Sequence, residues 1–294
     1  MRDIIRLMRP HEWIKNVLVL AGPVFAARLA DPRGAIAFVA FCLVSSAGYA
    51  INDVLDREAD EAHPEKRDRP IASGAVSPRL GVVFGIVLLA LSLAITIVLP
   101  RAVTWIVLGY FILMIVYSVD LKHRAIIDVI VIAIGFVLRA IAGSKSIDLV
   151  VSPWLMVCTF TLCLFLGFGK RRCELSTLSD RGDATAHRPT LMRYTPELLN
   201  HLTSVAAGIA IVTFLIYTLD HNPQSPAFVD PGFRKDYLLY TLPLVAYGLF
   251  RYAMLVESGR FTGPTQIILK DFGLIVTGIL WAAAAVAITL LTRT

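Results

Sequence analysis

The chain is organised around an apolar run that ends in carboxylates, Gly34-Ala-Ile-Ala-Phe-Val-Ala-Phe-Cys-Leu-Val-Ser-Ser-Ala-Gly-Tyr-Ala-Ile51 followed by Asn52-Asp-Val-Leu-Asp-Arg-Glu-Ala-Asp60. At helical spacing Asn52, Asp53, Asp56 and Asp60 lie on one face. Carboxylates that share a face repel one another unless a cation lies between them, and oxygen ligands of this kind suit Mg²⁺ bridged to a phosphate. The stretch predicts a metal-binding helix end. The alternative is a solvated acidic helix end just outside a membrane.

The composition places the chain in a membrane. It has 294 residues, of which 56% are hydrophobic and 17% charged, whereas soluble domains are about 45–50% apolar. A backbone within lipid must satisfy its own hydrogen bonds, as helices do. We therefore predict an all-α integral membrane protein.

The net charge of the chain is +6. The sequence has no basic stripes with interleaved aromatic residues, so this charge indicates no nucleic-acid partner.

Nine apolar runs are long enough to cross a hydrocarbon core of about 30 Å. They lie near residues 15–30, 34–55, 80–99, 102–118, 126–143, 153–168, 200–219, 237–256 and 270–291. Residues 1–15 alternate arginines with apolar side chains, which favours an amphipathic segment along the membrane surface. No soluble domain remains outside these runs, so residues 1–294 are expected to form one domain, a bundle of nine transmembrane helices.

Lys and Arg residues are shared unequally between the two sides of this expected bundle. Most lie at the N-terminus and in the loops after the second, fourth, sixth and eighth spans. Because short cytoplasmic loops carry the excess of Lys and Arg, we expect these segments on the cytoplasmic side of a plasma membrane. The carboxylates then open into the cytoplasm.

The same segments hold nearly every group able to do chemistry. Taken singly, each basic cluster is accounted for by the positive-inside bias, but several clusters converging on one carboxylate helix favour a site for phosphate groups. The candidates are Lys15 and Asn16 near the first span; Arg57, Lys66, Arg67 and Arg69 after the second; Tyr117, Lys122 and Asp128 around the fourth loop; and Lys170, Arg171, Glu174, Arg193 and Tyr194 after the sixth.

This combination suits the displacement of diphosphate. A leaving group with about three negative charges needs Mg²⁺ held by carboxylates, and Lys or Arg to neutralise the developing charge. The histidines are scattered, and neither a Ser-His-Asp nor a Cys-His arrangement nor a Gly-rich phosphate loop competes with this interpretation. The 4 cysteines have no paired metal spacing, so neither zinc nor a disulfide framework is indicated.

The sequence resembles the UbiA-type superfamily of intramembrane prenyltransferases. The resemblance rests on Asn52-Asp53-x-x-Asp56-x-x-x-Asp60, the nine spans and a second polar group after the fourth span, and it covers the whole chain. Further stretches are most similar to the branch that uses the polyprenyl chain as acceptor: Arg9-Pro-His-Glu-Trp-Ile-Lys-Asn16, Asn52 to Pro64, Tyr117-Ser with Leu121-Lys-His, and Gly135-Phe-Val-Leu-Arg-Ala-Ile-Ala-Gly143.

That branch implies Mg²⁺-dependent transfer of 5-phosphoribose from 5-phosphoribosyl 1-diphosphate to decaprenyl phosphate, with release of diphosphate, toward the arabinose donor of cell walls. On this hypothesis the metal ligands are Asn52, Asp53, Asp56 and Asp60. The catalytic groups are Asp53, Asp56, Asp60, Lys122 and Asp128, and the remaining candidates bind substrate. The partners are then these two substrates and the lipid bilayer.

One departure from the general superfamily pattern favours this branch. Aromatic prenyltransferases of this type carry a second close-spaced acidic motif, whereas here Asp120 and Asp128 lie eight residues apart with Lys122, His123 and Arg124 between them. A donor with an additional 5-phosphate and an acceptor that is itself a phosphate both need such positive charge. Which cation holds which phosphate stays open.

Other functions and the role of one residue also stay open. A prenyltransferase acting on an aromatic acceptor would use the same acidic helix with fewer cations, and a transporter or lipid flippase would show inverted repeats and polar groups near the midplane. Arg139 is expected on the same helix as Asp128, about 16 Å deeper in the membrane. An arginine inside a membrane is a substrate-binding candidate by default. The alternative is that its side chain snorkels to the far interface. Self-association also stays open.

Overall fold

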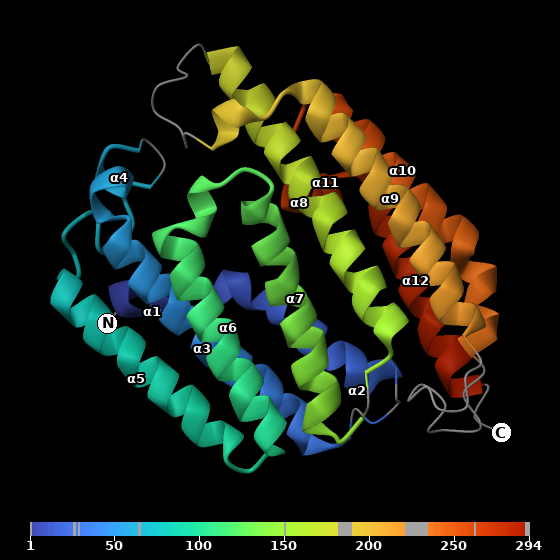
Figure 1. Ribbon diagram of the computed structural model, residues 1–294, viewed down its shortest axis with the longest axis horizontal. Coiled ribbons are helices and arrows are strands. Elements are labelled where there is room, and N and C mark those ends of the chain that lie inside the picture. Colours follow the sequence, from blue (N-terminus) through green and yellow to red (C-terminus); the bar gives the residue numbers. More distant parts are fainter. Residues whose placement is uncertain are drawn as a thin grey trace. The chain divides into compact units, whose positions relative to one another are not determined.

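A computed structural model describes residues 2–25, 28, 30–63, 66–149, 151–181, 190–220, 235–261 and 263–291 (Figure 1). Every regular element within these ranges is a helix, so the predicted all-α class is confirmed. The chain divides into two compact units. Unit 1 comprises Met1–Val24, Arg28–Val131 and Leu138–Leu149, and unit 2 comprises Phe25–Ala27, Ile132–Val137 and Val150–Thr294.

Unit 1 is built around one long helix, α3. Around it lie the other elements of the N-terminal half, several of which contact it directly. Asp31 caps α3 by accepting a hydrogen bond from the Arg33 backbone N–H at 3.0 Å, and Pro32 occupies its first position, as helix N-termini favour. The elements that lie wholly or mostly in unit 1 are, in chain order, α1 (Arg2–Met8), the 3₁₀ helix η1 (Pro10–Leu20), α2 (Ala21–Phe25), α3 (Pro32–Leu55), α4 (Arg57–Glu61), α5 (Pro78–Thr96), α6 (Arg101–Val119), η2 (Leu121–His123) and α7 (Ile127–Ser146).

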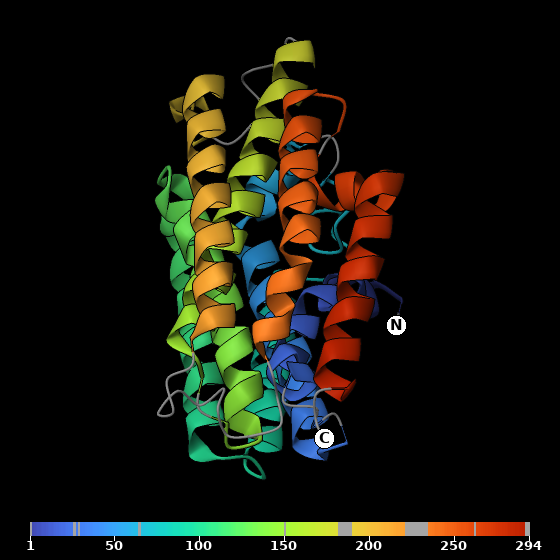
Figure 2. The ribbon, with the colours of Figure 1, turned by 90° about the vertical axis from the view of Figure 1, so that its right-hand side faces the viewer.

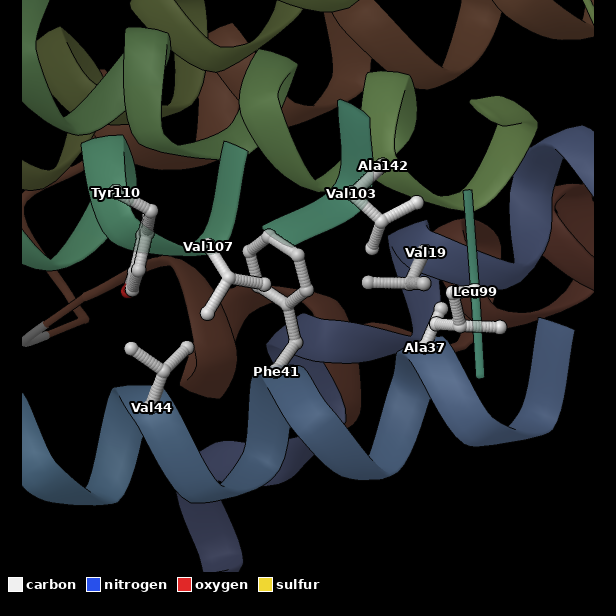
Figure 3. Close-up of a cluster of buried hydrophobic side chains, with 9 residues drawn as sticks. All are labelled: Val19, Ala37, Phe41, Val44, Leu99, Val103, Val107, Tyr110 and Ala142. Carbon is white, nitrogen blue, oxygen red and sulfur yellow. The ribbon is translucent and has the colours of Figure 1, made fainter. Parts of the chain in front are cut away.

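The apolar core of unit 1 joins η1 to three helices. Figure 3 shows the side chains of this cluster pointing toward one another from η1, α3, the loop between α5 and α6, α6 and α7. The rings of Phe41 on α3 and Tyr110 on α6 pack with their centroids 5.4 Å apart. The cluster consists of Val19, Ala37, Phe41, Val44, Leu99, Val103, Val107, Tyr110 and Ala142.

Glycines allow two close approaches in unit 1. A Cβ at Gly143 on α7 would lie 1.6 Å from the carbonyl oxygen of Val19, so only glycine lets the η1 backbone lie on α7 here. Gly81 and Gly85 form a GxxxG motif on α5, and Cβ atoms there would meet Val54 at 2.9 Å and Ile51 at 3.0 Å, both on α3. Such motifs bring helices together in membranes, and this one is used within the chain.

Unit 2 contains the remaining helices. Figure 2 shows α8, α9, α10 and α12 running side by side. Phe165 on α8 packs on Tyr252 of α10, with ring centroids 5.0 Å apart. Arg251 donates to both oxygens of Asp271 at 3.0 and 2.8 Å. The elements are α8 (Pro153–Arg181), η4 (Leu191–Arg193), α9 (Pro196–Leu219), η6 (Lys235–Thr241), α10 (Leu242–Glu257), α11 (Pro264–Lys270) and α12 (Phe272–Leu291).

Among the described residues, 7 helices are long and apolar enough to cross a membrane: Pro32–Leu55, Pro78–Thr96, Arg101–Val119, Ile127–Ser146, Pro153–Ser176, Pro196–Leu219 and Asp236–Glu257. They correspond to predicted spans two to eight. The last predicted span is represented by a shorter apolar helix, Phe272–Ile288. The described part of the chain therefore supports seven spans of this kind.

The predicted first span, residues 15–30, differs from the structure. It falls on η1 and α2, and residues 26, 27 and 29 lie outside the described residues. A 3₁₀ helix rises about 2 Å per residue, so hydropathy identified an apolar segment here but not its helix type. The expected surface segment 1–15 also packs on the protein, because Leu7 is fully buried in a cluster with Ala50, Ile71 and Val76.

Candidate active site

The carboxylates lie where α3 ends. The helix is interrupted at Asp56, yet backbone bonds from Asp56 N–H to Asn52 O at 2.9 Å and from Asp60 N–H to Asp56 O at 2.8 Å carry the chain into α4. Asp53 is 1% exposed and Asp60 is also buried, whereas the Asp56 side chain is 21% exposed. Of the three aspartates in the acidic stretch, two are therefore buried and one reaches the surface, so the stretch is not a solvated helix end.

Two arginines bind the buried carboxylates. Arg9 Nη2 donates to Asp53 Oδ1, and its guanidinium lies 5.1 Å from the ring centroid of Tyr49. Arg69 Nη1 donates to Asp53 Oδ1 at 3.2 Å and to Asp60 Oδ2 at 2.6 Å. Both cations come from segments outside α3, so the buried negative charge is balanced by the fold.

A lysine binds the third carboxylate. Lys122, buried in η2, donates from Nζ to Asp56 Oδ1. Asn52 Nδ2 donates to the other oxygen, Asp56 Oδ2, at 3.1 Å. Asp128 is buried in the first turn of α7, just after Ile126, whose φ of 70° is rare for a β-branched residue. The polar group predicted after the fourth span thus contacts the acidic stretch through the bond between Lys122 and Asp56.

The donor set fits Mg²⁺ bound together with a phosphate. Asp53 Oδ2 is buried and has no hydrogen-bond partner among the described residues, which costs free energy that a bound cation would recover. Within the same part of the chain, no group of three His, Cys, Asp or Glu side chains is arranged to hold a metal by itself. Mg²⁺ commonly takes only one or two carboxylates, with substrate phosphates and water completing its shell.

Two other candidates of unit 1 bind different carboxylates. Lys15 bonds Glu12, and although burial raises the pKa of Glu12, Lys15 and neighbouring positive charges outweigh it and the pKa is lowered. Arg57 donates to Glu61 at 2.7 Å on the surface of α4. The remaining candidates are Lys66, half-buried, and Arg67, exposed, in the loop before α5, and Tyr117, half-buried near the end of α6.

Asn16 and Arg139 are buried in the interior of unit 1. Arg139 is 5% exposed and donates from Nε to Asn16 Oδ1 at 2.8 Å and from Nη2 to Tyr110 Oη at 2.7 Å. Arg139 therefore does not snorkel to an interface. Both residues therefore make hydrogen bonds within the protein.

Unit 2 carries a basic cluster of its own. Arg171 is buried and donates to Glu174 Oε2 at 2.6 Å, while Lys170 is exposed with Nζ 3.7 Å from Glu174 Oε1. These residues lie on α8, which continues as a helix to Arg181, beyond the predicted span end at residue 168. Arg193 is exposed at the end of η4, and Tyr194 is buried.

The sequence does not indicate that these two arginines are the carboxylate partners. It offers Arg69 as one of several loop cations, and Arg9 as an N-terminal cation in a stretch that carries the family resemblance. One signal was available: Arg9 and Arg69 each precede a proline, which restricts the preceding backbone. Arg9 nevertheless adopts a left-handed conformation with φ 51° and ψ 60°, and no local pattern specifies its partner 44 residues away.

Comparison with known proteins identifies the family. Residues 16–272 match the family model described as the UbiA prenyltransferase family. The chain belongs to the UbiA prenyltransferase family. The predicted family is thereby confirmed, and the protein is a membrane-embedded, multi-pass transferase.

Relatives within the UbiA family cover nearly the whole chain. A decaprenyl-phosphate phosphoribosyltransferase of Mycolicibacterium smegmatis is 32% identical over 286 residues, covering 95% of this chain and 89% of that protein. One of Mycobacterium tuberculosis is 32% identical over 295 residues, covering 97% and 94%. A UbiA homolog from Archaeoglobus fulgidus, solved bound to GPP and Mg²⁺, has a TM-score of 0.71 at 20% identity, with 99% of each chain covered, and this likeness concerns the fold.

Replacing Arg69 with Gln tests the charge balance at the carboxylates. The variant leaves Asp53 and Asp60 with one cation fewer, so we expect a loss of about 2 kcal/mol of unfolding free energy, below the range for fully buried pairs because Arg69 is partly exposed. Arg79→Gln, at an exposed position on α5, is the control and should change stability by less than about 0.5 kcal/mol. Unfolding of both variants in the same detergent gives the comparison. If Arg69→Gln and Arg79→Gln were equally stable, Arg69 would not balance the charge of Asp53 and Asp60.

Proposed function

We propose that this UbiA-family protein transfers 5-phosphoribose from 5-phosphoribosyl 1-diphosphate to decaprenyl phosphate and releases diphosphate. The observation that carries the proposal is the pairing of the acidic stretch with Arg9, Arg69 and Lys122, since a donor rich in phosphate needs both metal ligands and cations. The names of relatives at 32% identity over at least 95% of the chain support the same substrates.

Asn52, Asp53, Asp56 and Asp60 are proposed to hold Mg²⁺, with Asp128 in a supporting role. When bound, the metal would neutralise charge on the diphosphate and so make it a better leaving group. The unpartnered Asp53 Oδ2 supports this assignment. The Mg²⁺ in the solved Archaeoglobus structure, which also contains GPP, agrees with it.

The cations around the carboxylates are proposed to bind phosphate oxygens of the donor. Arg9, Arg69 and Lys122 are already held at the acidic stretch, so they need little reorganisation to stabilise the charge that develops as the C1–O bond breaks. The sugar then gains oxocarbenium character at C1. Decaprenyl phosphate is already ionised near neutral pH, so the protein has to position it and needs no general base.

The remaining candidates are proposed to bind other phosphate groups. Lys15 would screen the donor's charge, and in unit 2 Lys170, Arg171 and Arg193 are candidates for the 5-phosphate or the acceptor phosphate. The family match spans parts of both units, which supports one catalytic domain over residues 1–294.

We further propose that the chain crosses a plasma membrane nine times. The N-terminus and the loops after the second, fourth, sixth and eighth spans are proposed to be cytoplasmic, because most Lys and Arg fall in those segments.

Two parallel reactions with the purified protein test the function. In the first, 5-phosphoribosyl 1-diphosphate labelled in the ribose is supplied with decaprenyl phosphate and Mg²⁺, and label should enter the lipid extract with one diphosphate released per lipid product. EDTA should abolish the transfer and excess Mg²⁺ restore it. In the second, labelled polyprenyl diphosphate is supplied with hydroxybenzoate and should give no product.

The opposite pattern would refute the proposal in favour of an aromatic prenyltransferase. Movement of an unmodified substrate across sealed vesicles, without a labelled lipid product, would favour a transporter and refute it as well.

A further inference from the structure

Arg139 joins three elements at the centre of unit 1. Its Nε donates to Asn16 on η1 at 2.8 Å and its Nη2 to Tyr110 on α6 at 2.7 Å, while Arg139 itself belongs to α7. The guanidinium also lies 4.7 Å from the ring centroid of Tyr110. Bonds from a charged donor are stronger than neutral ones, and the contact with the ring adds to them.

η1 is in turn attached to α3 by side-chain bonds at several points along its length. Asn16 Nδ2 donates to Ser45 Oγ at 3.1 Å, and Trp13 Nε1 donates to Ser46 Oγ at 3.0 Å. Ser46 Oγ also donates at 2.8 Å to the carbonyl of Met8, the last residue of α1. The series ends at Arg9, whose guanidinium binds Asp53.

η1 needs these contacts to keep its shape. It has 11 residues, whereas 3₁₀ helices are uncommon beyond about 3–4 residues because their hydrogen bonds have poorer geometry. Arg9, at its start, holds a left-handed backbone conformation that costs an L-residue free energy. A segment of this kind relaxes when its side-chain anchors are removed.

We infer that Arg139 is a positioning residue: acting through Asn16, it keeps η1 seated on α3 so that the Arg9 guanidinium stays on Asp53. The effect on turnover rests on the proposed function, whereas the effect on η1 does not. Arg139→Met removes both donors and the charge and keeps much of the side-chain length. Arg139→Lys keeps the charge, so it should restore part of the anchoring.

Hydrogen–deuterium exchange tests the structural half of the inference. In the full-length protein, Arg139→Met should speed exchange in residues 9–20 while α5 keeps the rate of the unchanged protein, and Arg139→Lys should be intermediate. Ser92→Ala is the control, because Ser92 is also buried and donates its hydrogen bond to the Ala40 carbonyl on α3 and not to η1. Unchanged exchange in residues 9–20 of Arg139→Met would overturn the inference.

Kinetics test the functional half. Arg139→Met should lower kcat/KM for 5-phosphoribosyl 1-diphosphate about tenfold, the effect of losing one charge-assisted hydrogen bond, and a raised KM should be part of that loss. A residue that only stabilises the fold would lower the active fraction, so kcat would fall at unchanged KM. Arg139→Lys should recover part of the KM effect.

A double variant separates positioning from general damage. Arg9→Ala already removes the contact that Arg139 maintains, so Arg9→Ala with Arg139→Met should be no worse than Arg9→Ala alone. If the double variant lost activity by the product of the two single-variant losses, the inference would be overturned. If the unchanged protein transfers no phosphoribose, the proposed function fails, and the exchange experiment still decides whether Arg139 holds η1.

Discussion

Replacing Asp56 with Asn is expected to lower kcat/KM for transfer on the order of a thousandfold in a protein that still folds. Asp56 accepts hydrogen bonds from Lys122 Nζ on Oδ1 and from Asn52 Nδ2 on Oδ2. The amide keeps the shape of the side chain but loses its negative charge. Both the proposed metal and Lys122 then lose a partner needed to bind the diphosphate. Because the side chain is 21% exposed, the variant leaves little uncompensated buried charge.

The measurement is a steady-state assay at saturating Mg²⁺, with unfolding followed in the same detergent. Glu58→Gln is the control, since Glu58 is an exposed carboxylate on α4, two residues beyond Asp56, and it should leave turnover unchanged. If Asp56→Asn kept a tenth or more of the activity, the assignment of this carboxylate to the metal would be wrong.

Gly143→Ala is expected to cause the largest loss of stability of any single methyl group added to unit 1. The added Cβ would lie 1.6 Å from Val19 O and 2.6 Å from Val19 C, and a backbone cannot turn aside as a side chain can. η1 would have to leave α7, which separates Val19 from Ala142 in the core. We expect a cost of at least about 3 kcal/mol, the upper end for overpacked interiors.

Gly109→Ala provides the matched comparison. Gly109 also lies inside a helix of unit 1, but a Cβ there meets nothing within 4 Å, and alanine is the better helix former. This variant should fold at least as well as the unchanged protein. Yield and thermal unfolding in detergent measure both variants, and equal stability of Gly143→Ala and Gly109→Ala would contradict the packing of η1 on α7.

Hydropathy was sufficient to predict most of the helices because they are apolar over their full length. The predicted spans 34–55, 102–118 and 200–219 agree with α3, α6 and α9 to within about four residues. It could not predict η1, since an apolar 3₁₀ helix and an apolar α-helix have the same composition. The side-chain contacts of η1, Trp13 with Ser46 and Asn16 with Arg139, join residues that are distant in sequence.

The acidic stretch was recognisable because Asn52, Asp53, Asp56 and Asp60 lie within nine consecutive residues. Its cationic partners were harder to assign, because the basic residues of the candidate segments outnumber those that reach a carboxylate. Lys122 was among the predicted catalytic residues and binds Asp56, whereas Arg57, also a candidate, binds Glu61 on the surface. Charge and spacing identify which residues are available, and only the tertiary fold decides which of them meet.

Equilibrium binding of 5-phosphoribosyl 1-diphosphate to the purified protein, measured with and without Mg²⁺, tests the central claim most directly. The claim is that the carboxylates at the end of α3 and the cations bound to them form a site for a metal-bound diphosphate. Saturable binding in Mg²⁺ that is lost in EDTA and in Asp56→Asn is the predicted result. Binding of equal affinity in EDTA, or unchanged binding in Asp56→Asn, would contradict it.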